Sequence, residues 1–274
     1  NYRRKRVIVC VTVALLTLIL TLGIRFVSQR NVNQQRILDF TSHTVRALDN
    51  VLLSLENHRN VLQPLVGQPC LQVQLALRQQ AAILQTVRSI ALIEDGILYC
   101  SSIFGSRSEP VRDVLQELPA STAKLILSTD QWLLKGSPVL IQWYPVSQDG
   151  EDGVVEIINI DLIARMILEP QRPLINDVVL TVGDRFLRYG QRVTDSLTFD
   201  EESALFQQSS TQNPFTITVG GPGPGELALK SLPAQLPLGL MLSLLLGYLA
   251  WLATANRMSF TWEIDMGIDR KSVV

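Results

Sequence analysis

The sequence predicts an α+β domain, with helices followed by an antiparallel sheet, between two membrane-spanning helices. Three observations lead to this prediction. Two uncharged apolar segments of eighteen residues each occupy residues 7–24 and 236–253. Between them, a region of helical periodicity comes first, and a series of short apolar runs separated by turn residues follows. Helices that precede an antiparallel meander are typical of α+β domains, and about 200 residues can bury a sizeable core.

The first apolar segment, Val7–Ile24, covers roughly 27 Å as a helix, which is just enough for the hydrocarbon core of a bilayer. The basic cluster Arg3–Arg6 precedes it, and a signal peptide also has basic residues before its apolar region. The apolar run is longer than that of a signal peptide, and no A-x-A-like cleavage site follows it. We therefore expect an uncleaved membrane anchor rather than a cleaved signal peptide.

The distribution of basic residues predicts the topology. The basic cluster precedes the first span, and Arg257 follows the second. By the positive-inside rule, residues 1–6 and 254–274 are then cytoplasmic. Residues 25–235 are expected on the other side of the membrane, which in a bacterium is the periplasm.

The second apolar segment contains Gly239, Ser243 and Gly247 at four-residue spacing, so they share one helix face. Small residues on one face let two helix backbones approach closely in lipid. Such a face could associate with a second copy of the chain and form a homodimer. Gly and Ser are also common in membrane spans, so a chance arrangement remains equally open.

The region that follows the first span predicts a long amphipathic helix over residues 28–62. Eight positions here follow alternating three- and four-residue steps and form one row along the helix, which we call the seam. Six of them are apolar, and Thr41 and Arg59 are the two exceptions. The apolar positions are Leu38, Val45, Leu48, Leu52, Leu55 and Leu62. This helix could pack on its own domain or pair with a second copy. We expect the first, because three heptads with two gaps make a weak coiled coil.

The remaining elements are shorter. A second helix is expected over residues 71–86, and Asp95-Gly96 between two apolar runs predicts a β-hairpin from 89–94 and 97–102. Residues 148–153 form a polar turn, and the Gly- and Pro-rich residues 220–225 are expected to be an irregular linker. Further strands are expected at 124–128, 139–146, 154–160, 178–182, 185–189 and 215–219, with a short helix at 161–168.

Composition excludes several classes of function. The 24 basic and 25 acidic residues nearly balance, which gives no reason to expect a nucleic-acid partner. The two histidines, His43 and His58, are too far apart on one helix to share a metal ion. No P-loop, dinucleotide-binding motif or Ser-His-Asp arrangement is present. We therefore expect no catalytic residues and no metal ligands in this chain.

The three cysteines differ in their surroundings. Cys10 lies inside the first apolar segment, where it serves as a small apolar residue. Cys70 and Cys100 are both expected outside the cytoplasm, where thiols tend to pair. Closing this loop would stabilise the fold by about 3.6 kcal/mol in the chain-entropy model. The pair can be a structural crosslink or a redox-sensitive switch, and composition alone favours the crosslink.

At these cysteines the sequence resembles a known family. Residues 87–92 (Val-Arg-Ser-Ile-Ala-Leu) lead into residues 95–102, which end in Cys100-Ser101-Ser102, and Phe104-Gly105 follows. Cys70 precedes a Leu-Arg pair, Leu77-Arg78. With the two flanking apolar segments, this pattern resembles the CSS-motif sensor domain of bacterial membrane-bound cyclic-di-GMP phosphodiesterases. The resemblance runs from the first span to about Asp269.

The resemblance implies a periplasmic sensor domain, for which a PAS/PDC-like fold is expected. It implies a Cys70–Cys100 disulfide, next to the motif residues Ser101 and Ser102, whose redox state controls a cytoplasmic EAL phosphodiesterase domain. Periplasmic thiol-disulfide oxidoreductases would then be partners, together with the lipid bilayer. On this basis the switch and the structural crosslink become equally favoured.

The EAL domain itself hydrolyses cyclic-di-GMP with Mg²⁺ or Mn²⁺, and its machinery is not found in these 274 residues. Glu226-Leu227-Ala228-Leu229 has the wrong order and lies before the second span. Residues 263–270 resemble the helix that enters an EAL domain, and we expect the chain to be cut, or its gene disrupted, after that point. The chain should bind cyclic-di-GMP only through the missing domain and show no phosphodiesterase activity of its own.

The sequence therefore predicts the sensory and membrane-anchoring part of a cyclic-di-GMP phosphodiesterase in the bacterial inner membrane. One alternative is the ligand-binding part of a chemoreceptor or histidine kinase. Such receptors usually have a HAMP-type linker after the second span, which residues 258–270 do not resemble. A second alternative is a structural inner-membrane protein.

Overall fold

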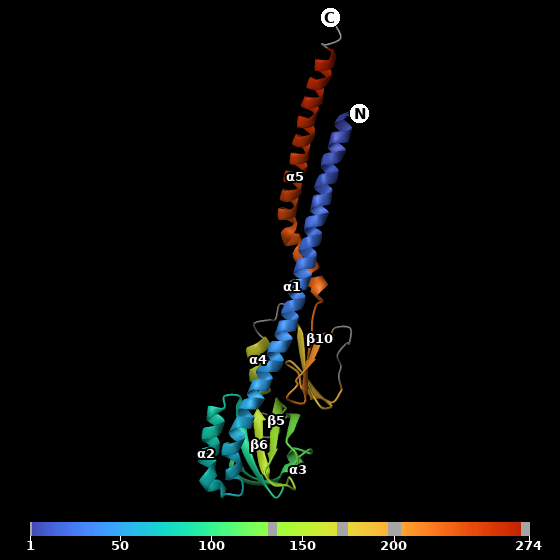
Figure 1. The fold of residues 1–274 in the computed structure, drawn as a ribbon. Coiled ribbons are helices and arrows are strands. Elements are labelled where there is room, and N and C mark those ends of the chain that lie inside the picture. Colours follow the sequence, from blue (N-terminus) through green and yellow to red (C-terminus); the bar gives the residue numbers. More distant parts are fainter. Residues whose placement is uncertain (1, 131–135, 169–174, 197–203, 270–274) are drawn as a thin grey trace. The chain divides into compact units, whose positions relative to one another are not determined.

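The computed structural model describes residues 2–130, 136–168, 175–196 and 204–269, which fall into two compact units. One unit, the helical pair, combines the residues up to Gln35 with those from Gly223 onward. The other, the α+β unit, comprises Arg36–Pro222. Helix α1 (Tyr2–Leu62) belongs to both, because it continues without a break from the first into the second (Figure 1).

The helical pair consists of the N-terminal part of α1 and helix α5 (Pro224–Asp269), which run antiparallel (Figure 1). Both contain a stretch that is long and apolar enough to cross a membrane. Near one end of the pair, the Arg6 guanidinium donates to the Trp251 carbonyl at 3.3 Å and lies 5.0 Å from the centre of its ring. A cation over an indole face is favourable when water is scarce, so this contact fixes the register of the two helices.

The linker expected at residues 220–225 is shorter in the structure. Gly220 ends a strand, and α5 already begins at Pro224. Proline lacks an N–H, but the first turn of a helix has no intrahelical partner for that group, so proline is tolerated there. Asn1 and residues 270–274, where the expected break in the EAL resemblance falls, lie outside the described residues.

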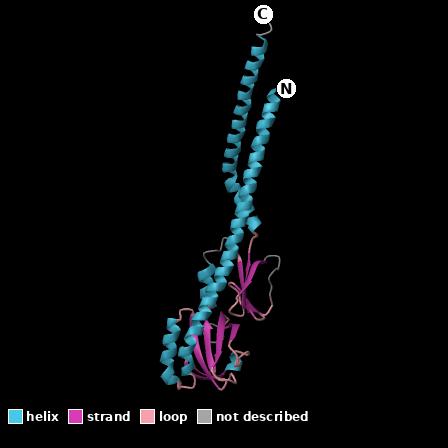
Figure 2. Cartoon of the chain, viewed as in Figure 1, coloured by secondary structure: helices cyan, strands magenta, loops and turns pink. Residues whose placement is uncertain are grey.

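The α+β unit contains two antiparallel sheets (Figure 2). The first has the strand order β3-β2-β1-β6-β5-β4 and the second β10-β11-β7-β8-β9. The strands of the first are β1 (Val87–Glu94), β2 (Ile97–Ser101), β3 (Gly105–Pro110), β4 (Lys124–Thr129), β5 (Pro138–Pro145) and β6 (Gly153–Ile158). Those of the second are β7 (Asp177–Val182), β8 (Arg185–Arg188), β9 (Val193–Thr194), β10 (Ala204–Ser209) and β11 (Phe215–Gly220). The helical elements are η1 (Gln63–Leu65), α2 (Cys70–Ile83), α3 (Val111–Val114) and α4 (Ile160–Leu168).

The structure confirms the α+β class and every strand that the sequence predicts. Several expected boundaries differ by one to three residues; for example, α2 ends at Ile83 rather than Thr86, and Ile160 begins α4 instead of ending β6. The sequence did not reveal β3, β9, β10 or the short α3. The β3 sequence, Gly-Ser-Arg-Ser-Glu-Pro, has no apolar alternation, because this strand forms the edge of its sheet.

The seam of α1 packs on its own domain, as expected. Leu48, Leu52 and Leu55 are buried in one cluster with Ile90 of β1 and Leu140 of β5. Thr41, a polar residue of the seam, is also buried, and its hydroxyl donates to the Ile37 carbonyl at 2.8 Å. A second cluster, which includes Trp143, lies on the opposite face of the six-stranded sheet beneath the segment around α3. The six-stranded sheet is therefore covered on both faces.

One buried residue conflicts with this apolar environment. Glu156, in the middle of β6, has Ile90 of β1 and Gln142 of β5 as its cross-strand neighbours. Its side chain is fully buried, and neither carboxyl oxygen has a hydrogen-bond partner among the described residues. Burial raises the pKa of Glu156 to about 8, because the charged form would lose its hydration without compensation. Near neutral pH the folded protein therefore carries this carboxyl in its protonated form.

The position of Glu156 predicts how stability depends on pH. The folded state retains its proton up to about pH 8, whereas an unfolded glutamate loses it near 4.5. The folded state then binds more protons between these values, so the free energy of unfolding should fall as pH rises from 5 to 8, by up to about 4 kcal/mol. Urea unfolding of the full chain in detergent, followed by tryptophan fluorescence across this pH range, measures the fall.

The Glu156→Gln variant should lose most of this pH dependence, because it has no proton to release. Glu94→Gln is the matched control, since Glu94 is exposed at the end of β1. It should follow the wild-type curve. Parallel curves for wild type and Glu156→Gln would contradict the buried, protonated carboxyl.

Candidate functional site

The structure joins Cys70 and Cys100 in a disulfide with an S–S distance of 2.02 Å and a Cα–Cα distance of 5.2 Å. Cys70 is the first residue of α2, and Cys100 lies in β2. Cys100 is completely buried, whereas Cys70 remains 9% exposed. The bond therefore attaches the start of α2 to the sheet, eight residues after α1 ends at Leu62.

The β1–β2 hairpin places Cys100 opposite Leu92. Asp95 and Gly96 form its two-residue turn with φ values of 52° and 70°, as a type I′ turn requires. Further along, the register shifts so that Ile93 lies opposite Leu98. Tyr99 is thus the extra residue of a β-bulge, and such bulges often change the direction of a side chain.

Tyr99 connects the strand to the segment between α1 and α2. Its hydroxyl accepts from the Gly67 N–H at 3.0 Å and donates to the Leu65 carbonyl at 3.3 Å. Burial raises the pKa of Tyr99 above its ordinary value, which keeps the hydroxyl protonated so that it can donate. Residues next to both cysteines are thus also held together by hydrogen bonds.

Ser102 extends the ladder beyond the end of β2. Its N–H donates to the Ile90 carbonyl at 2.8 Å, and its Oγ accepts from the Ile90 N–H at 3.0 Å. The Arg78 Nε of α2 donates to the Ser102 carbonyl at 2.9 Å. The neighbouring Ser101 Oγ accepts locally from the Ile103 N–H at 3.3 Å, where the chain turns towards β3. The two motif serines therefore have structural roles.

The glycine of the Phe-Gly pair is favoured by the local backbone conformation. Gly105 has a φ of 73°, and a Cβ at this position would lie 2.7 Å from Gln74 Nε2 of α2. A side chain here would therefore strain the backbone, and the end of the flexible Gln74 side chain would have to move aside. The whole segment from Tyr99 to Gly105 serves to hold α2 against the first hairpin.

This arrangement provides a covalent crosslink surrounded by satisfied polar groups, and it provides no activated nucleophile. Among the residues that the structure describes, no three His, Cys, Asp or Glu side chains lie together as metal ligands would. His43 is exposed on α1, and His58 is bound to the Ser54 carbonyl through Nδ1 at 2.8 Å. The chemistry available at this site is thiol–disulfide exchange.

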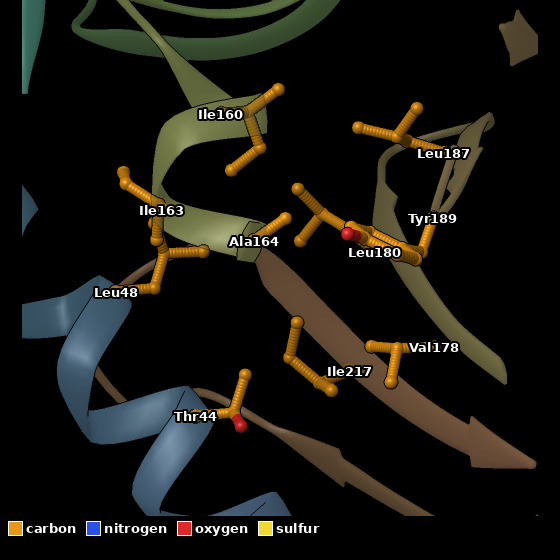
Figure 3. Close-up of a pocket in the computed structure, with 10 residues that line it drawn as sticks. All are labelled: Thr44, Leu48, Ile160, Ile163, Ala164, Val178, Leu180, Leu187, Tyr189 and Ile217. Atoms are coloured by element: carbon orange, nitrogen blue, oxygen red, sulfur yellow. The ribbon is translucent and has the colours of Figure 1, made fainter. Parts of the chain in front are cut away.

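A separate apolar cavity lies between α1, α4 and the five-stranded sheet (Figure 3). Its volume is about 50 Å³, a third of the roughly 150 Å³ cavity that accepts benzene. The Thr44 hydroxyl at its wall already donates to the Phe40 carbonyl at 2.9 Å. The other lining side chains include Leu48, Ile163, Leu180 and Ile217, which converge in the view. The cavity is too small for an amino acid, and among its lining residues only Thr44 and Tyr189 have polar side chains.

Comparison with known proteins agrees with this geometry. Residues 33–231 match the family described as "CSS motif domain associated with EAL". The chain belongs to this CSS-motif family. It is 56% identical over 268 residues to the Escherichia coli K12 protein named "Probable cyclic di-GMP phosphodiesterase PdeD", covering 98% of this chain and 50% of that protein. It is 22% identical over 193 residues to a second protein of that organism, named "Probable cyclic di-GMP phosphodiesterase PdeN", covering 68% of this chain and 36% of that protein. The chain thus spans half or less of the length of these relatives.

Solved structures with a similar fold are more distant. The ligand-binding domain of the Pseudomonas aeruginosa amino-acid chemoreceptor PctB is 14% identical with a TM-score of 0.47, covering 68% of this chain and 93% of that domain. The sensor domain of the Vibrio cholerae histidine kinase DctB is 12% identical with a TM-score of 0.43, covering 72% of this chain and 98% of that domain.

Several residues that support the CSS motif were not identified from the sequence. Tyr99 was not, because its role depends on a bulge whose position is set by strand pairing. Gln74 was not, because it approaches a residue far away in the chain, and Arg78 was noted only as part of a Leu-Arg pair, without its contact with Ser102. The sequence signal that could have indicated them is the position of Gly105, directly after the Cys-Ser-Ser segment.

The structure places the small-residue face of α5 against α1 of the same chain. A Cβ at Gly239 would lie 3.4 Å from the Leu18 side chain, and one at Gly247 would lie 3.3 Å from Ala14 Cβ. Ser243 between them is buried. This face is therefore used within one chain, and association with a second copy stays a prediction.

Replacing both glycines tests this packing. In the Gly239→Ile/Gly247→Ile variant the added side chains should separate α5 from α1 and weaken the contact between Arg6 and Trp251. Cysteines introduced at Leu18 and at Gly239 should crosslink in membranes of the otherwise wild-type chain, and far less when Gly247→Ile is added.

A membrane two-hybrid assay tests association between copies, and undiminished signal from the double variant would contradict a homodimer through this face.

The serines of the motif should differ in their contribution to stability. Ser102→Ala leaves the buried Ile90 N–H without its side-chain acceptor and should cost about 1–3 kcal/mol of unfolding free energy. Ser101→Ala should cost less, because its Oγ has only a local bond at 3.3 Å. Ser106→Ala, exposed on β3, is the control and should change little. Urea unfolding measures all three, and equal costs for Ser101→Ala and Ser102→Ala would contradict this assignment.

Proposed function

We propose that this chain is the membrane-anchored, redox-sensing regulatory part of a cyclic-di-GMP phosphodiesterase. In this proposal the thiol or disulfide state of Cys70 and Cys100 controls a cytoplasmic EAL domain that is not part of these 274 residues. The observation that carries the proposal is the placement of the disulfide, eight residues past the end of α1. The 56% identity to PdeD supports the type of output.

The continuity of α1 supplies a route for the signal. The helix contains the apolar segment Val7–Ile24 and ends at Leu62, and only η1 and a short turn separate it from Cys70. Reduction by a dithiol adds two electrons and two protons to the bond and leaves two thiols. The start of α2 would then be held to the sheet only by the burial of Val73 and Leu77 and by hydrogen bonds, and α1 could pack on the sheet differently. Coupling of this kind requires two discrete packings of α1.

The two apolar segments and their flanking charges support a membrane location. Residues 7–24 and 236–253 would both span the bacterial inner membrane, with residues 25–235 in the periplasm and both termini in the cytoplasm. Oxidation of the cysteines would fall to periplasmic thiol-disulfide oxidoreductases. Cyclic-di-GMP, and the Mg²⁺ or Mn²⁺ ions that its hydrolysis needs, would bind to the EAL domain.

A chimera tests the proposal directly. This chain replaces the corresponding half of PdeD, and cyclic-di-GMP turnover is measured in isolated membranes with and without dithiothreitol. If the bond is a switch, Cys70→Ala, Cys100→Ala and the double variant should all change turnover in the same direction as dithiothreitol does. They should also no longer respond to dithiothreitol. Cys10→Ser is the matched control, because Cys10 has no disulfide partner, and it should behave as wild type.

A structural crosslink gives a different pattern. Its loss should lower the free energy of unfolding by about 3.6 kcal/mol without changing the turnover of the molecules that remain folded. Turnover is therefore normalised to folded protein, measured as resistance to limited proteolysis. Unchanged normalised turnover in all three cysteine variants would reject the switch.

A further inference from the structure

Another cavity lies inside the helical pair, between the end of the apolar segment of α1 and the start of the apolar segment of α5. Its volume is about 390 Å³, more than twice that of the roughly 150 Å³ cavity that accepts benzene. Much of its wall is apolar, with Leu22 and Ile24 from α1 and Leu238 and Leu242 from α5. We call this cavity the interhelical pocket.

Antiparallel packing brings two polar side chains to the interhelical pocket. A Cβ at Gly239 of α5 would lie 3.7 Å from Thr21 Oγ1 of α1, so these two residues lie at the same level of the pair. One helical turn further, on the same faces, Arg25 follows Thr21 in α1 and Gln235 precedes Gly239 in α5. Both Arg25 and Gln235 line the pocket. They therefore approach it from the two helices at one level.

Neither of these two polar groups is satisfied by the part of the chain that the structure describes. Gln235 Oε1 is buried and accepts no hydrogen bond from a described residue, and Arg25 forms no hydrogen bond or ion pair with one. Thr21 in the same wall differs, because its hydroxyl already donates to the Thr17 carbonyl at 2.8 Å. A buried acceptor without a donor is costly. A ligand that complements the pocket therefore combines a negative group with a hydrogen-bond donor.

The position of the pocket along the helices indicates where such a ligand comes from. Arg25 directly follows the apolar residues 7–24, and Gln235 directly precedes the apolar residues 236–253. In the proposed membrane location, both residues lie at the level of the lipid headgroups. Arginine at the end of a membrane helix often reaches the headgroups without forming a site. Here a pocket and a buried acceptor lie beside the arginine, and together they describe a site for one molecule.

We infer that the interhelical pocket binds one anionic glycerophospholipid whose headgroup carries hydroxyl groups, as phosphatidylglycerol does. The lipid phosphate accepts from the Arg25 guanidinium, a headgroup hydroxyl donates to Gln235 Oε1, and the acyl chains follow Leu22 and Leu238. Arg25 is the only charged residue among those that line the pocket. The ammonium of phosphatidylethanolamine would therefore find no carboxylate there. The inference rests on the proposed membrane location and not on redox control.

Native mass spectrometry of the full chain in detergent micelles measures the lipid that stays bound. Titration with palmitoyl-oleoyl phosphatidylglycerol should show one molecule that binds more tightly than any further ones. Its affinity should exceed that of palmitoyl-oleoyl phosphatidylethanolamine by about fivefold or more, because only the anionic headgroup leaves the Arg25 charge balanced. Glycerol phosphate, which carries the headgroup chemistry without acyl chains, should not bind at the same concentrations.

Variants of the pocket separate this site from a general attraction of lipid to positive charge. Arg25→Gln should weaken binding of phosphatidylglycerol about tenfold, and Gln235→Leu about threefold, because they remove a charged and a neutral hydrogen bond. Ala234→Phe fills the pocket without changing its charge and should also weaken binding. The matched control is Arg30→Gln, which removes the same charge from an exposed residue of α1 outside the pocket, and it should change the affinity less than about twofold.

Equal weakening by Arg25→Gln and Arg30→Gln would overturn the inference, because it would show that charge alone attracts the lipid. Equal affinities for the two lipids, or binding of glycerol phosphate as tight as that of the lipid, would overturn it as well. All variants are compared at equal helical content, measured by circular dichroism, so that a folding defect is not counted as lost binding.

The premise of a membrane location is tested separately. Carbonate extraction should leave the chain in the membrane fraction, and its release would overturn both the membrane location and the lipid site. Cyclic-di-GMP turnover that ignores the disulfide would reject the proposed redox control, whereas the lipid affinities are measured without any phosphodiesterase and are read independently of it.

Discussion

The covalent bond between Cys70 and Cys100 is the constraint on which the arrangement of this domain depends. Helix α2 buries only Cys70, Val73 and Leu77, and an isolated helix of 14 residues is marginal in water. Three tertiary hydrogen bonds also hold this region: Arg78, near the middle of α2, donates to the Ser102 carbonyl, and Tyr99 bonds to Gly67 and Leu65 before the helix. Each contributes about 1 kcal/mol, whereas closing a thirty-residue loop contributes about 3.6 kcal/mol. Burial of Val73 and Leu77 makes a contribution of similar size, so the disulfide is one of the two main constraints on the position of α2.

Much of this fold was predictable from the sequence, because its signals are local. Asp95-Gly96 requires only two residues with positive φ, and the seam of α1 repeats over several turns. The edge strand β3 was not predictable, because its polar sequence becomes a strand only through pairing with β2. The same holds for Tyr99, since the bulge that turns its side chain towards Leu65 depends on the register of β1 against β2. Sequence reasoning thus found the cysteines but not the groups that hold them in place.

The same sheet also carries a destabilising group. Glu156 lies beside Ile90, and Ile90 is the residue that pairs with Ser102 at the end of the motif. Tyr144 lies on the same face of the sheet as Glu156, and its pKa is raised by burial and by the carboxyls of Glu156 and Glu56. The guanidinium of Arg59 in α1 lies 5.4 Å from the centre of the Tyr144 ring. The contact between α1 and the sheet therefore combines a buried leucine seam with polar groups that tolerate burial poorly. The two packings that the proposed switch requires would differ at this interface.

The two long helices are not equivalent as routes for a signal. Helix α5 contains Pro233 and Pro237, each of which removes a backbone hydrogen bond from the helix. Helix α1 has no proline between Tyr2 and Leu62, so its ladder of hydrogen bonds is unbroken from the apolar segment to η1. A displacement at the end of α1 can be transmitted along a continuous helix, whereas α5 can bend at its prolines and absorb one. Under the proposed function, a change in the disulfide would act first on α1, because the bond follows α1 and not α5 in the chain.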